Sequence, residues 1–464
     1  MYDFFVVLGA LFFLMFVAYR GFSVILFAPV AALLAVLLTD PGQVLPMYSS
    51  VFLDRMVEFL QLYFPVFLLG AVFGKVIELS GFSRAIVLSI IGIVGRQRAM
   101  LSIVVVCAVL TYGGVSLFVV VFAVYPFAAE MFKEVDIPKR LIPGTIALGA
   151  FTFTMDALPG TPQIQNIIPT TFFDTTTWAA PILGIVGSVF ILIAGLLYLE
   201  WRRRRAAAAG EGYGEGHINE PEPVAEERLP HAVLALSPLV AVFVLNRVFT
   251  ALIPRFYGEE HQLKLAGVSE PVVTDVTKLV AIWSVTGALL VGILLTVALS
   301  FNLIRNRFAE GTKAAVSGAL LASLNTASEY GFGGVIAGLS GFIVISDALR
   351  AIPNVLVNEA ITVSVLAGVT GSASGGMSIA LAAMSEKFIE AANAANVPLE
   401  VLHRVASMAS GGMDTLPHNG AVITLLAVTG LTHRQAYKDI FAITIVKTLA
   451  VFLIIGVYYL TGLY

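Results

Sequence analysis

Two short segments place an aspartate at the start of a proline-containing interruption in an otherwise apolar stretch. The first is DALPGTPQIQN, from Asp156 to Asn166, and the second is DTLPHNG, from Asp414 to Gly420. Since proline and a neighbouring glycine end a helix, each segment predicts a membrane helix that is broken in its middle. The helix N-termini at such breaks present N–H groups and a positive dipole end to an anion; the alternative is a pair of loops outside the membrane. The expected ligand contacts at the breaks are Gly160, Thr161, Gln163, Gln165, Asn166, Thr415, His418 and Asn419.

Glycine-rich sequences interrupt two further apolar stretches. They are TYGGVS, from Thr111 to Ser116, and TGSASGG, from Thr370 to Gly376. Glycine lets the backbone turn and approach a ligand closely, while hydroxyl groups donate hydrogen bonds. We interpret both sequences as tips of re-entrant hairpins that contact a solute, although small residues also serve helix–helix packing. The expected contacts at the tips are Gly113, Gly114, Ser116, Ser372, Ser374, Gly375 and Gly376.

Ionisable side chains at membrane depth are costly and are therefore candidates for function. Asp156 and Asp414 occupy matched positions at the two breaks, where each can carry a proton, bind a cation or cap the following helix. His418 titrates near neutral pH and suits either proton coupling or a structural hydrogen bond. Glu329 lies in the middle of an apolar stretch and is either a proton carrier or a buried acid paired within the protein. These four residues are the candidates for ion coupling.

The chain repeats itself, which is informative about the whole architecture. FGKVIELSGF, from Phe73 to Phe82, recurs as FGGVIAGLSGF, from Phe332 to Phe342, with eight of ten aligned positions identical and one glycine inserted. The glycine pairs of the two tips and the MDALPG and MDTLPH sequences of the two breaks follow in the same order, at offsets of about 258 to 262 residues. We predict two repeats, about 58–200 and 314–464. Because one starts with an inward-running span and the other with an outward-running span, the repeats are expected to be inverted, as in many transporters.

Composition indicates an all-α polytopic membrane protein. Of 464 residues, 58% are hydrophobic and 12% are charged, against about 25% charged in globular domains, and the mean hydropathy is +0.92. The net charge of −3 argues against a nucleic-acid partner. Cys107 is alone, so no disulfide or metal cluster can be built from cysteines, and no cofactor or metal is expected.

Apolar runs of bilayer length predict ten full spans, the first of them a retained span rather than a removable signal peptide. Residues about 100–130 and 361–390 are expected to form the two re-entrant hairpins, and residues 83–98 either an interfacial helix or another crossing. The spans are about 2–19, 22–39, 58–80, 141–170, 177–200, 231–253, 277–301, 314–338, 402–430 and 439–463.

One polar stretch divides the chain into two halves. Four arginines, Arg202 to Arg205, follow a span directly and mark the cytoplasmic side, and the Gly, Glu and Pro residues after them predict a flexible linker. With both termini outside, seventeen of the 27 Lys and Arg residues fall in cytoplasmic positions. We predict an N-terminal membrane half over 1–200, a cytoplasmic linker over 201–230 and a C-terminal membrane half over 231–464.

The sequence from Leu110 to Thr170, which holds the first tip and the first break, resembles the gluconate permease family within the ion transporter superfamily of organic-acid carriers. The similarity extends over essentially the whole chain and is greatest to the D-beta-hydroxybutyrate permease branch. The resemblance implies import of a small hydroxy-monocarboxylate, such as 3-hydroxybutyrate or a gluconate-like acid, with a co-transported proton across the bacterial inner membrane. It also implies a homodimer of the elevator type, with a scaffold and a moving transport domain that carries the hairpins and broken helices.

Several alternatives remain at this point. Sodium coupling is in doubt, because the Ser-Asn-Thr type of motif found in sodium-coupled relatives is missing from the breaks, and a cation–proton antiporter would need paired acids where this chain has single ones. A membrane enzyme lacks a recognisable metal or nucleophile motif, and a passive channel has no use for matched breaks. No arginine lies within the four interruptions, so recognition would rest on backbone N–H groups, hydroxyls, amides and His418. Such a site suits a monocarboxylate better than a polyanion.

Overall fold

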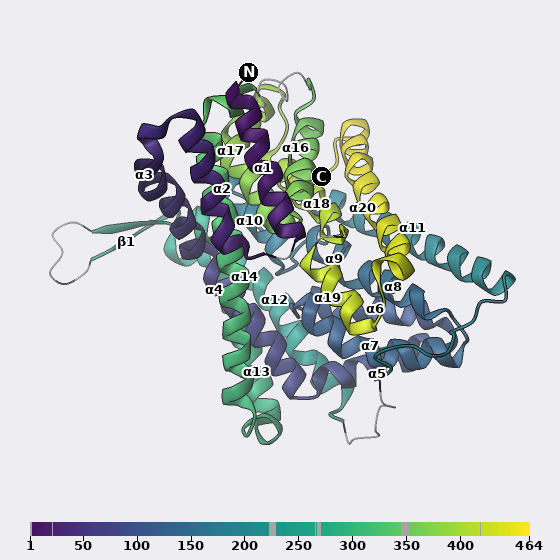
Figure 1. The fold of residues 1–464 in the computed structure, drawn as a ribbon. Helices are drawn as coiled ribbons and strands as arrows, with labels where there is room; N and C mark the ends of the chain where they lie inside the picture. The colour runs from purple at the N-terminus through teal and green to yellow at the C-terminus, as the bar shows by residue number, and fades with distance from the viewer. Residues whose placement is uncertain are drawn as a thin grey trace.

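Helices make up nearly all of the regular structure in the computed structural model, which describes residues 2–20, 22–221, 229–264, 266, 271–344, 352–417 and 419–464. Within these ranges the strands are β1 (Glu260–Leu263) and β2 (Val272–Asp275), which pair antiparallel with Glu260 opposite Asp275. This small hairpin projects from the side of the helical body (Figure 1). The predicted all-α polytopic fold is confirmed.

The first half begins with two helices and then runs through a long helix, a hairpin and a broken helix to a second long helix. Short turns over Pro41–Gln43, Tyr48–Phe52, Arg96–Arg98 and Lys139–Leu141 join some of them. The helices are α1 (Tyr2–Tyr19), α2 (Val24–Thr39), α3 (Val44–Met47), α4 (Leu53–Leu79), α5 (Phe82–Val94), α6 (Ala99–Tyr112), α7 (Leu117–Glu134), α8 (Ile142–Ala150), α9 (Phe153–Asp156), α10 (Ile164–Phe173) and α11 (Pro181–Ala208).

The second half follows the same order. Two helices lead to a long helix, then to a hairpin, a broken helix and a final long helix. They are α12 (Ala232–Tyr257), α13 (Val276–Ile304), α14 (Phe308–Ala337), α16 (Val355–Thr370), α17 (Ala373–Ala394), α18 (Leu399–Gly411), the 3-10 turn η5 (Gly412–Thr415), α19 (Gly420–Thr429) and α20 (His433–Thr461).

The two halves pack against each other crosswise. The long helices α4 and α14 lie together, α2 of the first half contacts α14, and α13 of the second half contacts α4. Likewise α7 contacts α19, and α10 contacts α17. The α6–α7 and α16–α17 hairpins lie on opposite sides of the molecule (Figure 1). These exchanged contacts are those expected of two related units in inverted orientation, and they bring the hairpin of each half beside a broken helix of the other.

Fewer helices than predicted are long and apolar enough to cross a bilayer on their own. In the described ranges five pass by length and composition: Pro41–Leu79, Pro181–Ala208, Ala232–Tyr257, Val276–Ile304 and His433–Thr461. A sixth crossing is possible if α5 and α6, which meet at a 103° bend, act as one span. The prediction of ten full spans exceeds this number: α2 has only 16 residues, and the expected spans 141–170 and 402–430 are each split between several helices.

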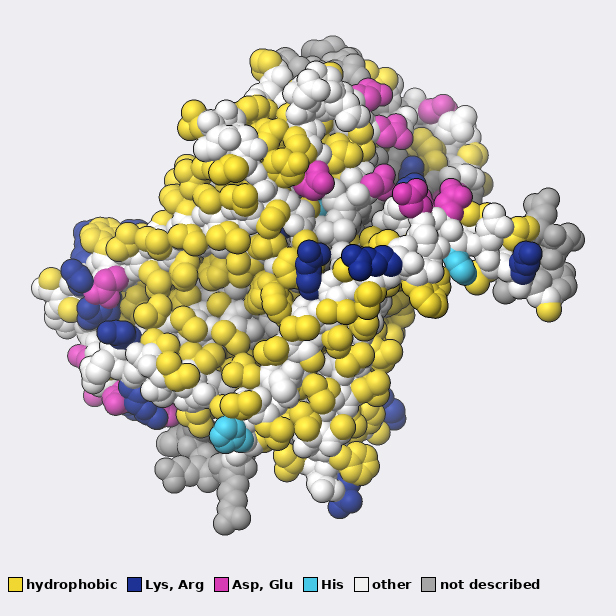
Figure 2. Space-filling view, turned by 180° about the vertical axis from the view of Figure 1, so that it is seen from behind, with side chains coloured by type: hydrophobic (Ala, Val, Ile, Leu, Met, Phe, Trp, Pro, Cys, Tyr) yellow, Lys and Arg dark blue, Asp and Glu magenta, His cyan; other side chains and the backbone are white. Residues whose placement is uncertain are grey.

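The outer surface is suited to lipid. Large apolar side chains are widely exposed, among them Phe256 at 82% and Leu460 at 87%. Hydrophobic side chains cover most of the face in Figure 2, and many of its Lys and Arg side chains gather along the left edge. Because water would oppose such exposure, the surface supports a membrane environment.

The segment after the four arginines folds back onto the helices, contrary to the prediction of a flexible linker. The ammonium of Lys139 is buried and donates to Ile218 O (2.9 Å) and to Glu220 Oε1 (2.7 Å). Asn219 accepts at its carbonyl from Tyr125 of α7 (2.7 Å) and donates from Nδ2 to the carbonyl of residue 427 in α19 (2.9 Å). A buried lysine requires such acceptors, so residues 211–220 bind the two halves together; residues 222–228 lie outside the described ranges.

Asp439 joins the start of α20 to α11 and to the turn at Lys139–Leu141. Its buried carboxylate accepts from Arg202 Nε (2.5 Å), Tyr198 OH (2.9 Å) and Arg140 Nη1 (3.3 Å). We expect Asp439→Asn to destabilise the protein by about 3 kcal/mol, since breaking a buried ion pair leaves a charge uncompensated. Thermal unfolding in detergent checks this, with a thiol-reactive dye reporting the exposure of the buried Cys107. The exposed Glu386→Gln is the control, and equal melting temperatures for both variants would contradict the prediction.

Candidate functional site

The first break lies between α9 and α10, as predicted. Pro159, Gly160, Thr161 and Pro162 leave the helical path there. Gly160 has a φ of +80°, and a β-carbon at this position would lie 2.5 Å from the ring of Trp178, so only glycine fits. The carbonyl of Gly160 accepts a hydrogen bond from Asn246 Nδ2 of α12 (3.0 Å).

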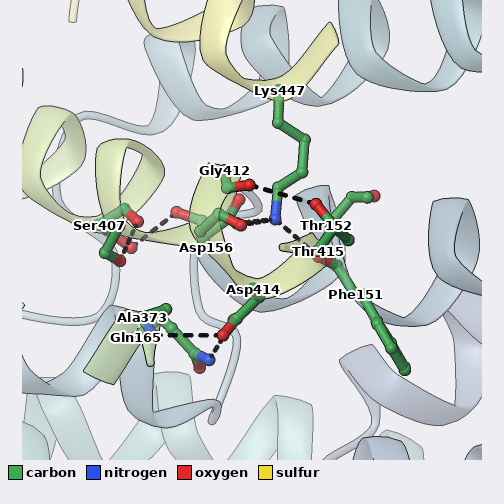
Figure 3. Close-up of polar contacts among 12 residues, drawn as sticks. Phe151, Thr152, Asp156, Gln165, Ala373, Ser407, Gly412, Asp414, Thr415 and Lys447 are labelled. Carbon is green, nitrogen blue, oxygen red and sulfur yellow. Dashed lines mark hydrogen bonds and ion pairs between the residues drawn. The ribbon is translucent and has the colours of Figure 1, made fainter. Parts of the chain in front are cut away.

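The second break lies between η5 and α19, and the two breaks meet in the interior. Gln165 Nε2 of α10 donates to Asp414 Oδ2 (2.9 Å), although the two residues are 249 positions apart. Asp414 also accepts from the backbone N–H of residue 373 (3.3 Å) at the start of α17 and from Asn419 Nδ2 (3.3 Å). Asp156 and Asp414, which the sequence matches, therefore lie in one buried region, shown in Figure 3.

Lys447 of α20 supplies a cation to this region. Its Nζ lies 3.1 Å from Asp156 Oδ2, donates to Phe151 O (2.6 Å) and also contacts Gly411 O. In Figure 3 the side chain reaches from α20 to the first break, and both members of the ion pair are about 1% exposed. A buried pair of this kind costs desolvation that good geometry must offset, which marks it as a candidate for function.

Arg404 of α18 is a second buried cation at the first break. Its guanidinium donates from Nη1 to Asp156 O (2.9 Å) and Asn166 Oδ1 (3.0 Å), and from Nη2 to the carbonyl of residue 179 (2.7 Å). His403 beside it hydrogen-bonds through Nε2 to Asn166 Oδ1 (3.2 Å) and through Nδ1 to Thr175 (2.7 Å). The four interruptions themselves contain no arginine, but Arg404 reaches the first break from the neighbouring helix α18. We call Asp156, Asp414, Gln165, Lys447 and Arg404 the polar centre.

Thr161 and Asn166 hold the first break together from within. Thr161 Oγ1 donates to Thr154 O (2.7 Å), and Asn166 Nδ2 donates to Thr161 O (3.1 Å) and Thr177 O (2.9 Å). Both side chains are fully buried. The structure places them in the wall of the site, where they fix the backbone.

Each hairpin tip is tied to the break of its own half. At the first tip Gln163 Nε2 donates to Thr111 O (2.7 Å), and at the second Asn419 Nδ2 donates to Gly371 O (3.0 Å). Gln163 and Asn419 are the N-caps of α10 and α19, while the N-caps of α7 and α17 are Ser116 and Ser372. Each half therefore sets two helix N-termini side by side, and their positive dipole ends favour an anion.

The glycines of the first tip are required for close packing. A β-carbon at Gly113 would lie 2.5 Å from the side chain of Leu239 in α12, and Gly114 has a φ of +96° with Pro162 of the first break beside it. Ser116 makes no side-chain capping bond at α7. The structure therefore gives the glycines a packing role and leaves Ser116 available at the N-terminus.

At the second tip the glycines adjoin Glu329 of α14. A β-carbon at Gly375 would lie 1.5 Å from Glu329 Oε2, and one at Gly376 would lie 2.1 Å from the backbone of residue 367. Ser372 Oγ caps the N–H of Gly375 (3.0 Å), and Ser374 lies 3.4 Å from Thr326 of α14. Glu329 is buried, and its Oε2 has no hydrogen-bond partner among the described residues.

The remaining predicted contacts at the second break are Thr415 and His418. Thr415 is buried, donates to Gly412 O (3.1 Å) and lies 2.7 Å from Thr444 of α20, so it joins the second break to the helix that carries Lys447. His418 lies outside the described residues. Lys447, Arg404 and His403 were not among the predicted site residues, and the available signal was an ionisable side chain within an apolar helix.

Comparisons with known proteins give one relative at high identity. No family model matches the chain. The uncharacterized transporter YxjC of Bacillus subtilis (strain 168) is 58% identical over 468 residues, which cover 99% of each chain. Among solved structures, the YdaH transporter of Alcanivorax borkumensis, whose crystal structure is described as revealing an unusual topology, matches with a TM-score of 0.46 and 13% identity over 92% of this chain and 90% of that one.

Proposed function

The chain belongs to the family of the Bacillus subtilis transporter YxjC and is a membrane transporter rather than an enzyme, and we propose that it is a secondary active carrier that imports a small hydroxy-monocarboxylate together with a proton. The observation that carries this proposal is the convergence of two matched helix breaks on a buried polar centre. An inverted pair of breaks around one centre suits alternating access.

The chemistry of the site supports an anionic substrate. The helix N-termini of α7 and α10 lie together at the first tip, and those of α17 and α19 lie together at the second. Ser116, Gln163 and Ser374 offer hydroxyl and amide groups beside them. Because Lys447 and Arg404 are already engaged by oxygens of the protein, neither of them offers free positive charge to a substrate. The balance favours one carboxylate and its hydroxyl over a polyanion such as citrate.

The assignment to the gluconate permease family, the homodimer, the elevator movement and the bacterial inner membrane are parts of the same proposal. The ties between each tip and its own break would let hairpins and broken helices move as one body. The crosswise packing of α2 on α14 and of α13 on α4 offers a scaffold for that movement. Asp156, Asp414, His418 and Glu329 remain the candidates for proton transfer.

Uptake by proteoliposomes tests the proposal. We expect labelled 3-hydroxybutyrate or gluconate to accumulate in potassium buffer when the vesicle interior is alkaline, because an inward proton gradient then drives symport. A protonophore should abolish the accumulation, and unlabelled lactate or glycerate should compete better than citrate. Accumulation that requires a sodium gradient would replace proton coupling with sodium coupling. A failure of all four hydroxy acids both to be transported and to raise the melting temperature would reject the substrate class.

A further inference from the structure

The ammonium of Lys447 has the surroundings of a bound cation. Three oxygen atoms contact Nζ, namely Phe151 O, Gly411 O and Asp156 Oδ2. Carbonyl and carboxylate oxygens are also the ligands that hard metal cations prefer. In carriers built from repeats, free carbonyls at the C-terminal ends of half-helices bind the coupling cation.

The two carbonyls come from corresponding places in the two halves. Phe151 directly follows the last residue of α8, and Gly411 is the last residue of α18, and α8 and α18 precede the break in their respective halves. The C-terminal end of a helix carries partial negative charge. Two such ends and one carboxylate therefore face a single point, and Lys447 places its charge there.

The lysine occurs in one half alone. Asp156 and Asp414 are matched by the repeat, whereas α11, the helix that corresponds to α20, has no charged residue from Pro181 to Leu199. The site is also closely built, because a β-carbon at Gly411 would lie 1.7 Å from Asp156 Oδ2. The two halves therefore share the aspartate but not the lysine. Two symmetric ion pairs that serve the structure alone would have both residues in each half.

We propose that Lys447 is a tethered substitute for a coupling cation. Its ammonium fills a monovalent cation site made by Phe151 O, Gly411 O and Asp156, so the protein needs no sodium, and removal of the ammonium opens the site to Na⁺. The role of Lys447 in the transport cycle rests on the proposed function, but the cation site itself can be measured without any substrate.

The test is Lys447→Met, whose side chain ends one atom short of the ammonium and leaves its position empty. The melting temperature is measured by dye labelling of Cys107 in sodium chloride and in choline chloride. We expect sodium to raise the melting temperature of Lys447→Met by several degrees, because a ligand that binds the folded state stabilises it. The wild type and the exposed Lys438→Met, on the same helix, should show no difference between the two salts.

Uptake gives a second measurement. Lys447→Met is expected to transport only in sodium, while the wild type transports equally in both salts. A wild type that melts or transports differently in sodium overturns the proposal, and so does a folded Lys447→Met that ignores sodium. A Lys447→Met that folds in neither salt also overturns the proposal, because sodium then fails to replace the ammonium. The double variant Lys447→Met with Asp156→Asn is the control for the carboxylate. It lacks both charges and should be indifferent to sodium, so a sodium response in it also overturns the proposal. Failure of uptake by every variant and by the wild type rejects the substrate and leaves the melting result as it stands.

Discussion

Replacing Arg404 with methionine is expected to abolish uptake and to lower the stability by about 3 kcal/mol or more. The guanidinium is fully buried and supplies hydrogen bonds to Asp156 O, Asn166 Oδ1 and the carbonyl of residue 179. A hydrogen bond from a charged group contributes about 1.5–3 kcal/mol, and the carbonyl of residue 179 would be left without a partner among the described residues, while Asp156 O and Asn166 Oδ1 keep those from Ser407 and His403. The first break would lose the group that fixes its path, and Asp156 would lose a neighbouring positive charge.

Two further variants separate charge from geometry at this position. Arg404→Lys keeps the charge, but an ammonium cannot reproduce the planar fork of the guanidinium, so an intermediate melting temperature is expected. Arg434→Met removes an exposed arginine at the start of α20 and should match the wild type. Melting curves from Cys107 labelling and uptake in proteoliposomes are the measurements. Wild-type melting and uptake in Arg404→Met would show that the break holds its conformation without this residue.

The sequence was a sufficient guide to where the helices break. Pro159 and Gly160 within an apolar stretch predict the first interruption, and the structure ends α9 at Asp156 and begins α10 at Ile164. The same reasoning places the first tip between α6 and α7. These features are local, because a proline or glycine pair acts on the backbone beside it. The order of the elements followed as well, since the repeated sequences appear in the same order in both halves.

The contacts between distant segments were not predictable in the same way. Lys447 and Arg404 have no matching cation in the first half, and most of their acceptors are backbone carbonyls, which leave no mark in the sequence. Asn166 is a further case. The sequence predicts it as a ligand contact but does not reveal that its amide hydrogen-bonds to Arg404 and to the carbonyls of the break. The predicted number of spans was too high because the length of an apolar run does not reveal where its helix bends.

Gly375 gives the second large effect, through its contact with Glu329. In Gly375→Ala the new methyl group would overlap the end of the Glu329 side chain, whose Oε2 lies 1.5 Å from the β-carbon position. Because a side-chain end can rotate, we expect the protein to fold, with the carboxyl displaced from the tip and uptake lost. Gly376→Ala should instead prevent folding, since its methyl group meets the backbone of residue 367. Gly318→Ala, on α14 with open space around it, is the control and should behave as the wild type.

Combining Gly375→Ala with Glu329→Ala distinguishes the two roles that Glu329 could have. Removing the carboxyl makes room for the methyl group, so the contact between α14 and α17 should close again and the melting temperature should recover. If Glu329 carries the proton, uptake driven by a pH gradient stays absent in the double variant although the structure is restored. If Glu329 only fills space at the tip, uptake returns together with the melting temperature. We expect the first result. A buried carboxyl whose Oε2 has no hydrogen-bond partner among the described residues costs stability, and an apolar side chain could fill the same space without that cost.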